Sequence, residues 1–142
     1  MAEETLHLQI ITPDKQLVRE EVDQVQVPGK SGYLGVLPGH APLLTELMIG
    51  EISYNKGGET HHFAVSWGFA EVLPHKVTIL ADTAERAEDI DVKRAQEAKA
   101  RAEEALRNPS PDLDYDAVNF ALRRAEVRLE VAGKAGHTAT TK

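Results

Sequence analysis

The first half of the chain alternates apolar and polar residues with the two-residue period of a β-strand. Alternating apolar positions occur in two segments: Leu6, Leu8, Ile10 and Val25, Val27. Two further runs are rich in β-forming residues: 63–65 and 77–80. Turn signals containing Pro, Gly or Asn separate these runs: 12–14, 28–29, 38–39, 55–58 and 73–75. Short strands at close spacing predict an antiparallel β-sandwich, or flattened barrel, over residues 1–84.

The period changes after Ile90 to that of a helix. Small residues recur every three or four positions and therefore lie on one helical face: Ala95, Ala98, Ala102 and Ala105. Charged residues occupy the other faces, as on a solvated surface. Asn108 precedes Pro109, and proline cannot continue a helix. The first helix is therefore predicted to end before Asn108.

A second helix is predicted to begin near Asp114, a residue type that caps helix N-termini. Its apolar stripe is expected to consist of Val118, Leu122, Ala125, Leu129 and Ala132. Gly133 is a natural stop. The short connection predicts an antiparallel hairpin over residues 85–133, followed by a disordered tail over 134–142. The fold class is therefore α+β, with a β domain first and a helical domain second.

The alanine face affects how firmly the helices are held. Small side chains let helix axes approach to about 8 Å, but each contact buries little apolar area. Such a hairpin packs closely yet is held weakly, and it can detach from the surface on which it rests. The alternative is an ordinary, permanently packed pair of helices.

Composition excludes several classes of protein. With 142 residues, 42% hydrophobic and 27% charged, the chain has the composition of a folded globular protein. The absence of cysteine excludes disulfides and thiolate chemistry. A net charge of −7 argues against nucleic-acid binding, which needs a basic face. No apolar run is long enough to span a bilayer, and the acidic N-terminus is neither a signal nor a transit peptide. Membrane association is therefore expected only through partners.

The segment 35–44 closely resembles the signature of F-type ATP synthase epsilon subunits. It reads Gly35-Val36-Leu37-Pro38-Gly39-His40-Ala41-Pro42-Leu43-Leu44. The neighbouring segments 11–13, 32–35, 68–72 and 80–84 match the family in the same order. The residues that match the family's signature loop are Gly35, Pro38, Gly39, His40 and Pro42. The prolines stiffen the loop's backbone, and the glycines permit backbone angles that other residues resist. No nucleophile or carboxylate is placed to form a triad with His40, which we interpret as structural.

The resemblance implies a function without catalysis. Members of this family have a β-sandwich and a helical hairpin, and they belong to the central stalk of a proton-translocating rotary enzyme. The sandwich is expected to contact the gamma subunit and the c-ring, the latter through Ser31, Gly32 and Tyr33. The hairpin of this family can extend toward the catalytic alpha/beta head and obstruct ATP hydrolysis. The lack of a transit peptide favours the cytoplasmic face of a bacterial plasma membrane.

A second motif, at the start of the hairpin, resembles that of epsilon subunits that bind ATP. The matching residues are Glu85, Ile90, Asp91, Arg94, Ala95, Arg124 and Arg128. Arg124 and Arg128 are four residues apart, so their guanidinium groups project from one helical face. If the helices fold together, Arg94 joins them in a cluster suited to a triphosphate. Glu85 and Asp91 are acceptors for the adenine amino group or ribose hydroxyls. ATP would then be a regulatory ligand that stabilises the folded hairpin.

Other interpretations of these residues remain open. Asp91 also suits a simple helix cap, and the arginines also suit exposed ion pairs with Glu97 or Glu130. The adjacent histidines His61 and His62 have no third ligand at usable spacing, so no metal site is predicted. A different class of function is a free-standing ATP-sensing or ligand-binding protein that uses the same hairpin site. No set of nucleophile, base and oxyanion donors supports an enzyme.

Overall fold

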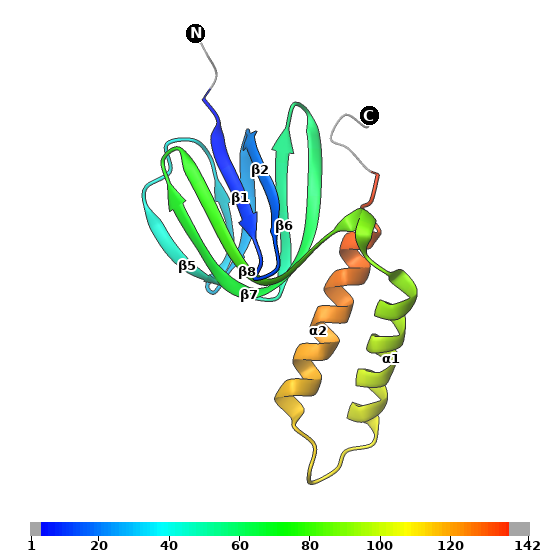
Figure 1. Ribbon diagram of the computed structural model, residues 1–142. Coiled ribbons are helices and arrows are strands. Elements are labelled where there is room, and N and C mark those ends of the chain that lie inside the picture. The colour runs from blue at the N-terminus through cyan, green and yellow to red at the C-terminus, as the bar shows by residue number, and fades with distance from the viewer. Residues whose placement is uncertain (1–3, 137–142) are drawn as a thin grey trace.

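The computed structural model describes residues 4–136, which form a β domain and a two-helix hairpin (Figure 1). The strands are β1 (Leu6–Ile11), β2 (Gln16–Val22), β3 (Gln24–Gly29), β4 (Gly32–Val36), β5 (Leu43–Leu47), β6 (Gly50–Lys56), β7 (Glu59–Leu73) and β8 (Lys76–Arg86). A 3₁₀ turn, η1 (Ala87–Asp89), leads into helices α1 (Val92–Arg107) and α2 (Tyr115–Ala132). The predicted α+β architecture is confirmed.

The eight strands form one hydrogen-bonded sheet that folds over into a sandwich. The strand order is β2-β1-β8-β7-β5-β3-β4, and β6 pairs with both β3 and β7. Seven of the eight ladders are antiparallel; β1 and β8 run parallel, with Leu8 opposite Val77. The sequence analysis expected only antiparallel pairs. The parallel ladder arises because the last strand returns beside the first, a long-range pairing that the spacing of apolar residues does not encode.

The core follows from the alternating pattern. Leu6, Leu8 and Ile10 of β1 are fully buried, whereas the residues between them are partly exposed. Alternate side chains of a strand point to opposite faces, so one face of β1 packs into the interior. The largest buried side chains between the layers include Tyr54, Phe63, Leu47, Ile52 and Ile79. This apolar core fixes the positions of β7 and β8, which carry the site.

Strand β7 turns a corner of the sandwich at Trp67 and Gly68. Before the corner β7 pairs with β6, and after it with β5. Trp67 has a φ of 57° and Gly68 a φ of 129°, so both leave the extended conformation. A Cβ on Gly68 would lie 2.0 Å from the Leu80 carbonyl oxygen. Only glycine permits β7 and β8 to approach this closely at the corner.

Both helices are capped where the sequence predicts. The Asp91 side chain accepts a hydrogen bond from the Arg94 amide, and the Asp114 side chain accepts one from the Ala117 amide. Asn108 closes α1, and Gly133 follows the last residue of α2. The buried alanines Ala95 and Ala102 of α1 lie on the predicted small-residue face.

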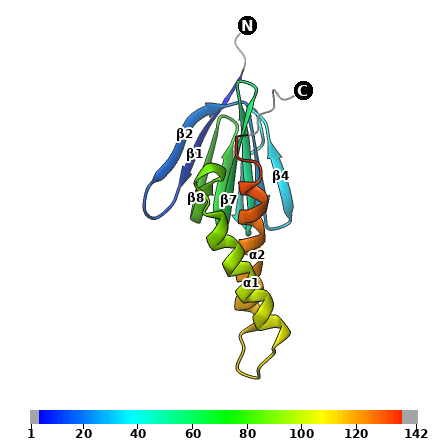
Figure 2. The same ribbon diagram turned by 90° about the vertical axis from the view of Figure 1, so that its right-hand side faces the viewer.

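The hairpin meets the sandwich through the C-terminal half of α2. Its tip points away from the strands, and the two helices lie side by side below them (Figures 1 and 2). Val127 and Val131 are buried in a small cluster with residues of the β domain and the linker: Ile49, Ala64, Ala87 and Ile90. The main core of the sandwich is a separate cluster. The hairpin is therefore docked on the sandwich and not part of its core.

Two boundaries differ from those expected. Strand β8 continues to Arg86, beyond the domain boundary predicted after residue 84. Residues 134–136, predicted to belong to a disordered tail, instead form a turn in which the Lys134 and Ala135 amides donate to Val131 and Ala132. The rest of that predicted tail, 137–142, lies outside the described residues. Neither described helix is long and apolar enough to cross a membrane.

Candidate functional site

A hollow of about 330 Å³ lies where α2 docks on strands β7 and β8. The strands contribute Ala64, Val65, Ser66, Thr83 and Glu85, and the helix contributes Arg124, Val127 and Arg128. The hollow therefore has a cationic wall on one domain and a wall with two hydroxyls and a carboxylate on the other. Three of the seven residues of the predicted ATP motif line it: Glu85, Arg124 and Arg128.

Glu85 and Arg128 form an ion pair across the domain junction. The Arg128 Nε donates to Glu85 Oε1 over 2.6 Å, and both side chains are about one third exposed (33% and 34%). This hydrogen bond raises the pKa of Arg128 above its usual value, and the nearby charge of Asp91 contributes. A carboxylate from β8 thus pairs with a guanidinium from α2, so the pair connects the two domains.

Arg124 makes no ion pair with any residue among those described, although it lines the same hollow. Its predicted alternative, an exposed pair with Glu130, is not formed. Among residues 4–136, the Arg124 guanidinium is unpaired, and only the Nε of Arg128 is engaged. Several N–H donors of the two arginines therefore remain available at the hollow. Donors in this arrangement suit an anion with several oxygens, such as a phosphate chain.

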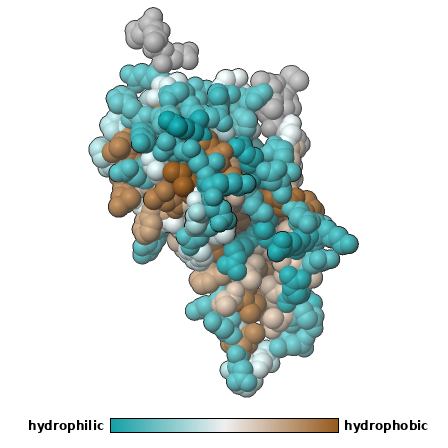
Figure 3. All heavy atoms as spheres, viewed as in Figure 1, coloured by the Kyte–Doolittle hydropathy of each residue, from teal (hydrophilic) through white to brown (hydrophobic). Residues whose placement is uncertain are grey.

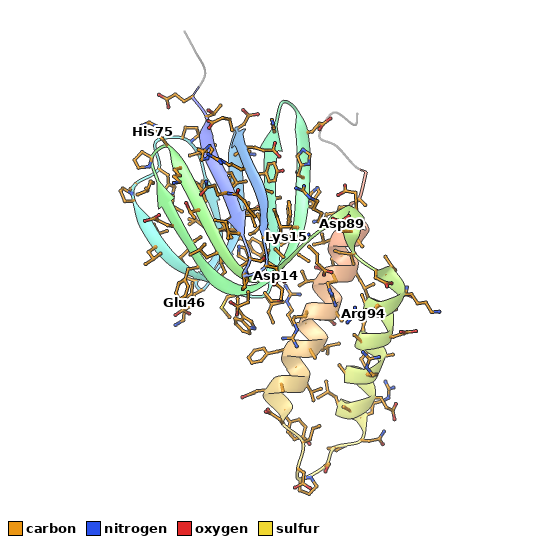
Figure 4. The ribbon with its side chains drawn as sticks, in the orientation of Figure 1. Asp14, Lys15, Glu46, His75, Asp89 and Arg94 are labelled. Carbon is orange, nitrogen blue, oxygen red and sulfur yellow. The ribbon has the colours of Figure 1, made fainter. Side chains whose placement is uncertain are left out.

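The remaining motif residues lie at the start of α1, outside the hollow. Ile90 is buried against Val127 and Val131, and Ala95 is fully buried, so both act in packing. Asp91 caps α1 through the Arg94 amide at 3.1 Å, as its alternative interpretation predicts. The Arg94 side chain is exposed on the first turn of α1 (Figure 4). The structure thus brings Arg124 and Arg128 together at the hollow but does not place Arg94 in its lining.

A second contact between the domains was not anticipated from the sequence. The Lys134 ammonium donates to Glu51 Oε1 over 2.6 Å, and the other oxygen of Glu51 bonds to His62 Nδ1. Glu51 and His62 are mostly buried, with side chains 17% and 15% exposed. This set closes the C-terminal end of α2 onto β6 and β7. Its partners are 83 residues apart, so no local motif points to the contact.

Trp67 provides a third contact. Its ring meets that of Phe120 of α2 edge-on, with centroids 5.0 Å apart. Aromatic pairs in this geometry contribute roughly 0.5–1.5 kcal/mol beyond their area burial. The sequence contains one tryptophan, and that residue lies on the docking surface of the hairpin.

The predicted c-ring-facing turn and the signature loop lie on the sandwich. Tyr33 is 53% exposed, and its hydroxyl accepts a hydrogen bond from the Glu51 amide over 3.0 Å. In the signature loop, the His40 Nδ1 lies 2.7 Å from the Ala41 carbonyl oxygen and therefore donates to it. That bond constrains the loop next to Pro42 and suits the structural role expected of His40.

One outer face of the sandwich is apolar and exposed. Leu44, Phe69 and Leu80 are 69%, 50% and 52% exposed, on the neighbouring strands β5, β7 and β8. Phe69 and Leu80 are cross-strand partners, so their side chains share this face. Figure 3 shows hydrophobic residues gathered on this side of the molecule. Exposed apolar side chains gathered on neighbouring strands are typical of a surface that binds another protein.

Comparisons with known proteins cover both domains. Residues 5–87 match the family described as ATP synthase, Delta/Epsilon chain, beta-sandwich domain, and residues 88–133 match its long alpha-helix domain. An ATP synthase epsilon chain of Geobacter sulfurreducens is 50% identical over 133 residues, which are 93% of this chain and 96% of the relative. The chain belongs to the ATP synthase epsilon-chain family. A second family member, from Koribacter versatilis, is 62% identical over 109 residues, 77% of each chain.

Solved structures agree with the family assignment. A chain in the cryo-EM structure of the Euglena gracilis mitochondrial ATP synthase (OSCP/F1/c-ring) superposes with a TM-score of 0.79 and 26% identity. The match covers 92% of this chain and 82% of that one. A chain of the Tetrahymena thermophila mitochondrial ATP synthase central stalk and c-ring shares the fold, with a TM-score of 0.56 and 16% identity. The fold and family expected from the 35–44 signature are thus confirmed.

Proposed function

We propose that this epsilon-family chain is a non-catalytic subunit of the central stalk of a proton-translocating, F-type ATP synthase. Its sandwich binds the gamma subunit and the c-ring and helps to couple ring rotation to the catalytic alpha/beta head. The observation that carries this proposal is the exposed apolar face of Leu44, Phe69 and Leu80 on a chain that matches the family over its length. These partners would hold the chain at the cytoplasmic face of a bacterial plasma membrane.

The hairpin is the regulatory part of the proposed function. It rests on the sandwich through a small apolar cluster, one cross-domain arginine pair, the Glu51–Lys134 contact and the Trp67–Phe120 ring contact. Partly exposed ion pairs contribute only about 0–1 kcal/mol, and the cluster is much smaller than the sandwich core. Detachment therefore costs little compared with unfolding the sandwich. The detached hairpin extends toward the catalytic head and obstructs ATP hydrolysis.

ATP is the proposed regulatory ligand of this hairpin. Support comes from the hollow at the docking surface, where Arg124 and Arg128 present guanidinium groups beside Glu85. A ligand that binds only the docked form shifts the population toward it. At one hundred times its dissociation constant, ATP would stabilise docking by about 2.7 kcal/mol. High ATP then relieves inhibition, and ATP depletion permits the inhibited state.

Co-purification with the gamma subunit of the same source tests the stalk assignment. We expect the chain to form a stable complex with gamma. The double variant Phe69→Glu, Leu80→Glu should abolish this complex, because it would bury two charges in an apolar contact. Tyr115→Glu is the matched control, since Tyr115 is a 44% exposed aromatic residue at the hairpin tip. Failure of the unmodified chain to bind gamma would favour a free-standing ATP-sensing protein instead.

Titration calorimetry on the isolated chain tests ATP binding. We expect heat of binding from ATP, and at least a tenfold loss of affinity in Arg124→Ala, the effect of removing one charge-assisted hydrogen bond of roughly 1.5–3 kcal/mol. Arg123→Ala is the control, because the Arg123 side chain is exposed and does not line the hollow, although it is adjacent to Arg124 in the sequence. No heat from ATP in the unmodified chain would end this part of the proposal.

A further inference from the structure

Ser66 is the one polar residue that is buried among those described, at 7% exposure, and it lines the hollow. Its hydroxyl has no hydrogen-bond partner in the described part of the chain. No buried side-chain nitrogen or oxygen of the described residues lacks a hydrogen-bond partner, so this hydroxyl is open to the hollow and not sealed in the core. It is therefore free to bond to a ligand in the hollow.

Ser66 shares this hollow with the two arginines of α2. Ser66 and Thr83 come from β7 and β8 and are directly paired across the ladder, so both hydroxyls form one floor. Arg124 and Arg128 of α2 form the wall above it. Hydroxyl and guanidinium groups both donate hydrogen bonds to phosphate oxygens. Glu85 lies in the same lining and repels anions, so it suits a hydrogen-bond donor of the ligand.

We propose that the sandwich, through the hydroxyls of Ser66 and Thr83, forms the floor of the nucleotide site and contacts the phosphate chain. This inference rests on the proposed binding of ATP. It adds hydrogen-bond donors on the sandwich side of the site, because every arginine of that motif lies on the hairpin and Glu85, its residue on β8, is an acceptor. The phosphates then lie between α2 and β7–β8 and not between the two helices.

The proposed geometry explains how the ligand acts on docking. A ligand held only by α1 and α2 would stabilise the hairpin but leave its contact with the sandwich unchanged. A phosphate chain bonded to Arg124 on one side and Ser66 on the other loses one set of contacts whenever the hairpin detaches. Differential contact of this kind is what allows a ligand to shift a conformational equilibrium.

Ser66→Ala tests the inference in two independent measurements. Because the hydroxyl makes no hydrogen bond within the described chain, the variant is expected to keep the melting temperature of the unliganded protein. ATP affinity in titration calorimetry should fall about two- to tenfold, the range for one neutral hydrogen bond. Thr83→Val, which keeps the side-chain shape, should lower affinity by a similar factor. Ser53→Ala on β6, outside the hollow, is the control and should bind ATP normally.

Each result decides a different point. The affinity for inorganic tripolyphosphate should fall by the same factor in Ser66→Ala. Normal tripolyphosphate binding by this variant would overturn the proposed phosphate contact. Undiminished ATP affinity in both Ser66→Ala and Thr83→Val would overturn the floor while leaving the arginine site intact. A lower melting temperature with normal ATP binding would make Ser66 a structural residue. No ATP binding by the unmodified chain would end the proposed function itself and this inference with it.

Discussion

At the level of single residues, the corner of β7 at Gly68 predicts a loss of stability on substitution. Gly68→Ala should destabilise the chain by at least about 2–3 kcal/mol, because the new methyl group would overlap the Leu80 carbonyl oxygen and the φ of 129° disfavours alanine. Urea unfolding followed by circular dichroism measures the change. Gly57→Ala is the control: its φ is 60°, but no atom lies within 4 Å of the added carbon. Equal, small effects in both variants would contradict the tight corner.

Long-range polar contacts are the residue-level feature that the sequence did not predict. Asp91 and Asp114 were identified as helix caps because a cap is a local pattern of side chain and amide. The Glu85–Arg128 pair joins residues 43 positions apart, and the motif alone had suggested a ligand-binding role for both. Ser66 carries no signal in the sequence, since its position beside the arginines is visible only in the fold.

Tyr54 predicts a loss of stability at high pH. Burial raises the pKa of Tyr54 from 10.0 to about 12, and the charge of Glu20 adds to this. The unfolded chain loses the tyrosine proton near pH 10 whereas the folded chain keeps it to about pH 12, so the free energy of unfolding falls as pH rises between them. Urea unfolding at pH 9, 10 and 11 measures this slope. Tyr54→Phe should flatten it, and an unchanged slope in that variant would exclude Tyr54 as its source.

At the scale of elements, the sequence predicted the helices but only one face of α2. The predicted stripe contains Ala125 and Leu129, whereas Val127 and Val131 bury the face that meets the sandwich. Both sets recur at helical spacing, so α2 is apolar on more than one side. Periodicity identifies each face but does not say which partner covers it. That information comes from the long-range packing of α2 on β7.

The face of α2 formed by Val127 and Val131 predicts a variant that weakens docking and leaves the sandwich folded. Val131→Ala removes two buried carbons and should weaken docking by about 1.5 kcal/mol, at roughly 0.8 kcal/mol for each. The fluorescence of Trp67, which contacts Phe120 of α2, should shift toward that of an exposed indole. Val118→Ala removes the same carbons from the distal half of α2 and is the control. A loss of cooperative unfolding of the sandwich in Val131→Ala would show that the two clusters are not separate.

At the scale of the whole molecule, a rigid sandwich carries a hairpin that it holds by few contacts. The sandwich was predictable because alternation and turn signals specify short strands, and the 35–44 signature specified the family. The parallel β1–β8 ladder and the docked position of the hairpin were not predictable, since both depend on residues far apart in sequence. The docked arrangement creates the hollow, so the position of the hairpin determines whether the proposed site exists.

The distance between sandwich and hairpin, measured with and without ATP, tests this account most directly. The chain has no cysteine, so Lys15→Cys and Gln96→Cys on the two domains can carry spin labels at exposed positions (Figure 4 labels Lys15). We predict one narrow distance distribution at saturating ATP and a second, displaced population without it, with the effect of ATP lost in Arg124→Ala. A single distribution that ATP does not change would contradict a ligand-controlled, detachable hairpin.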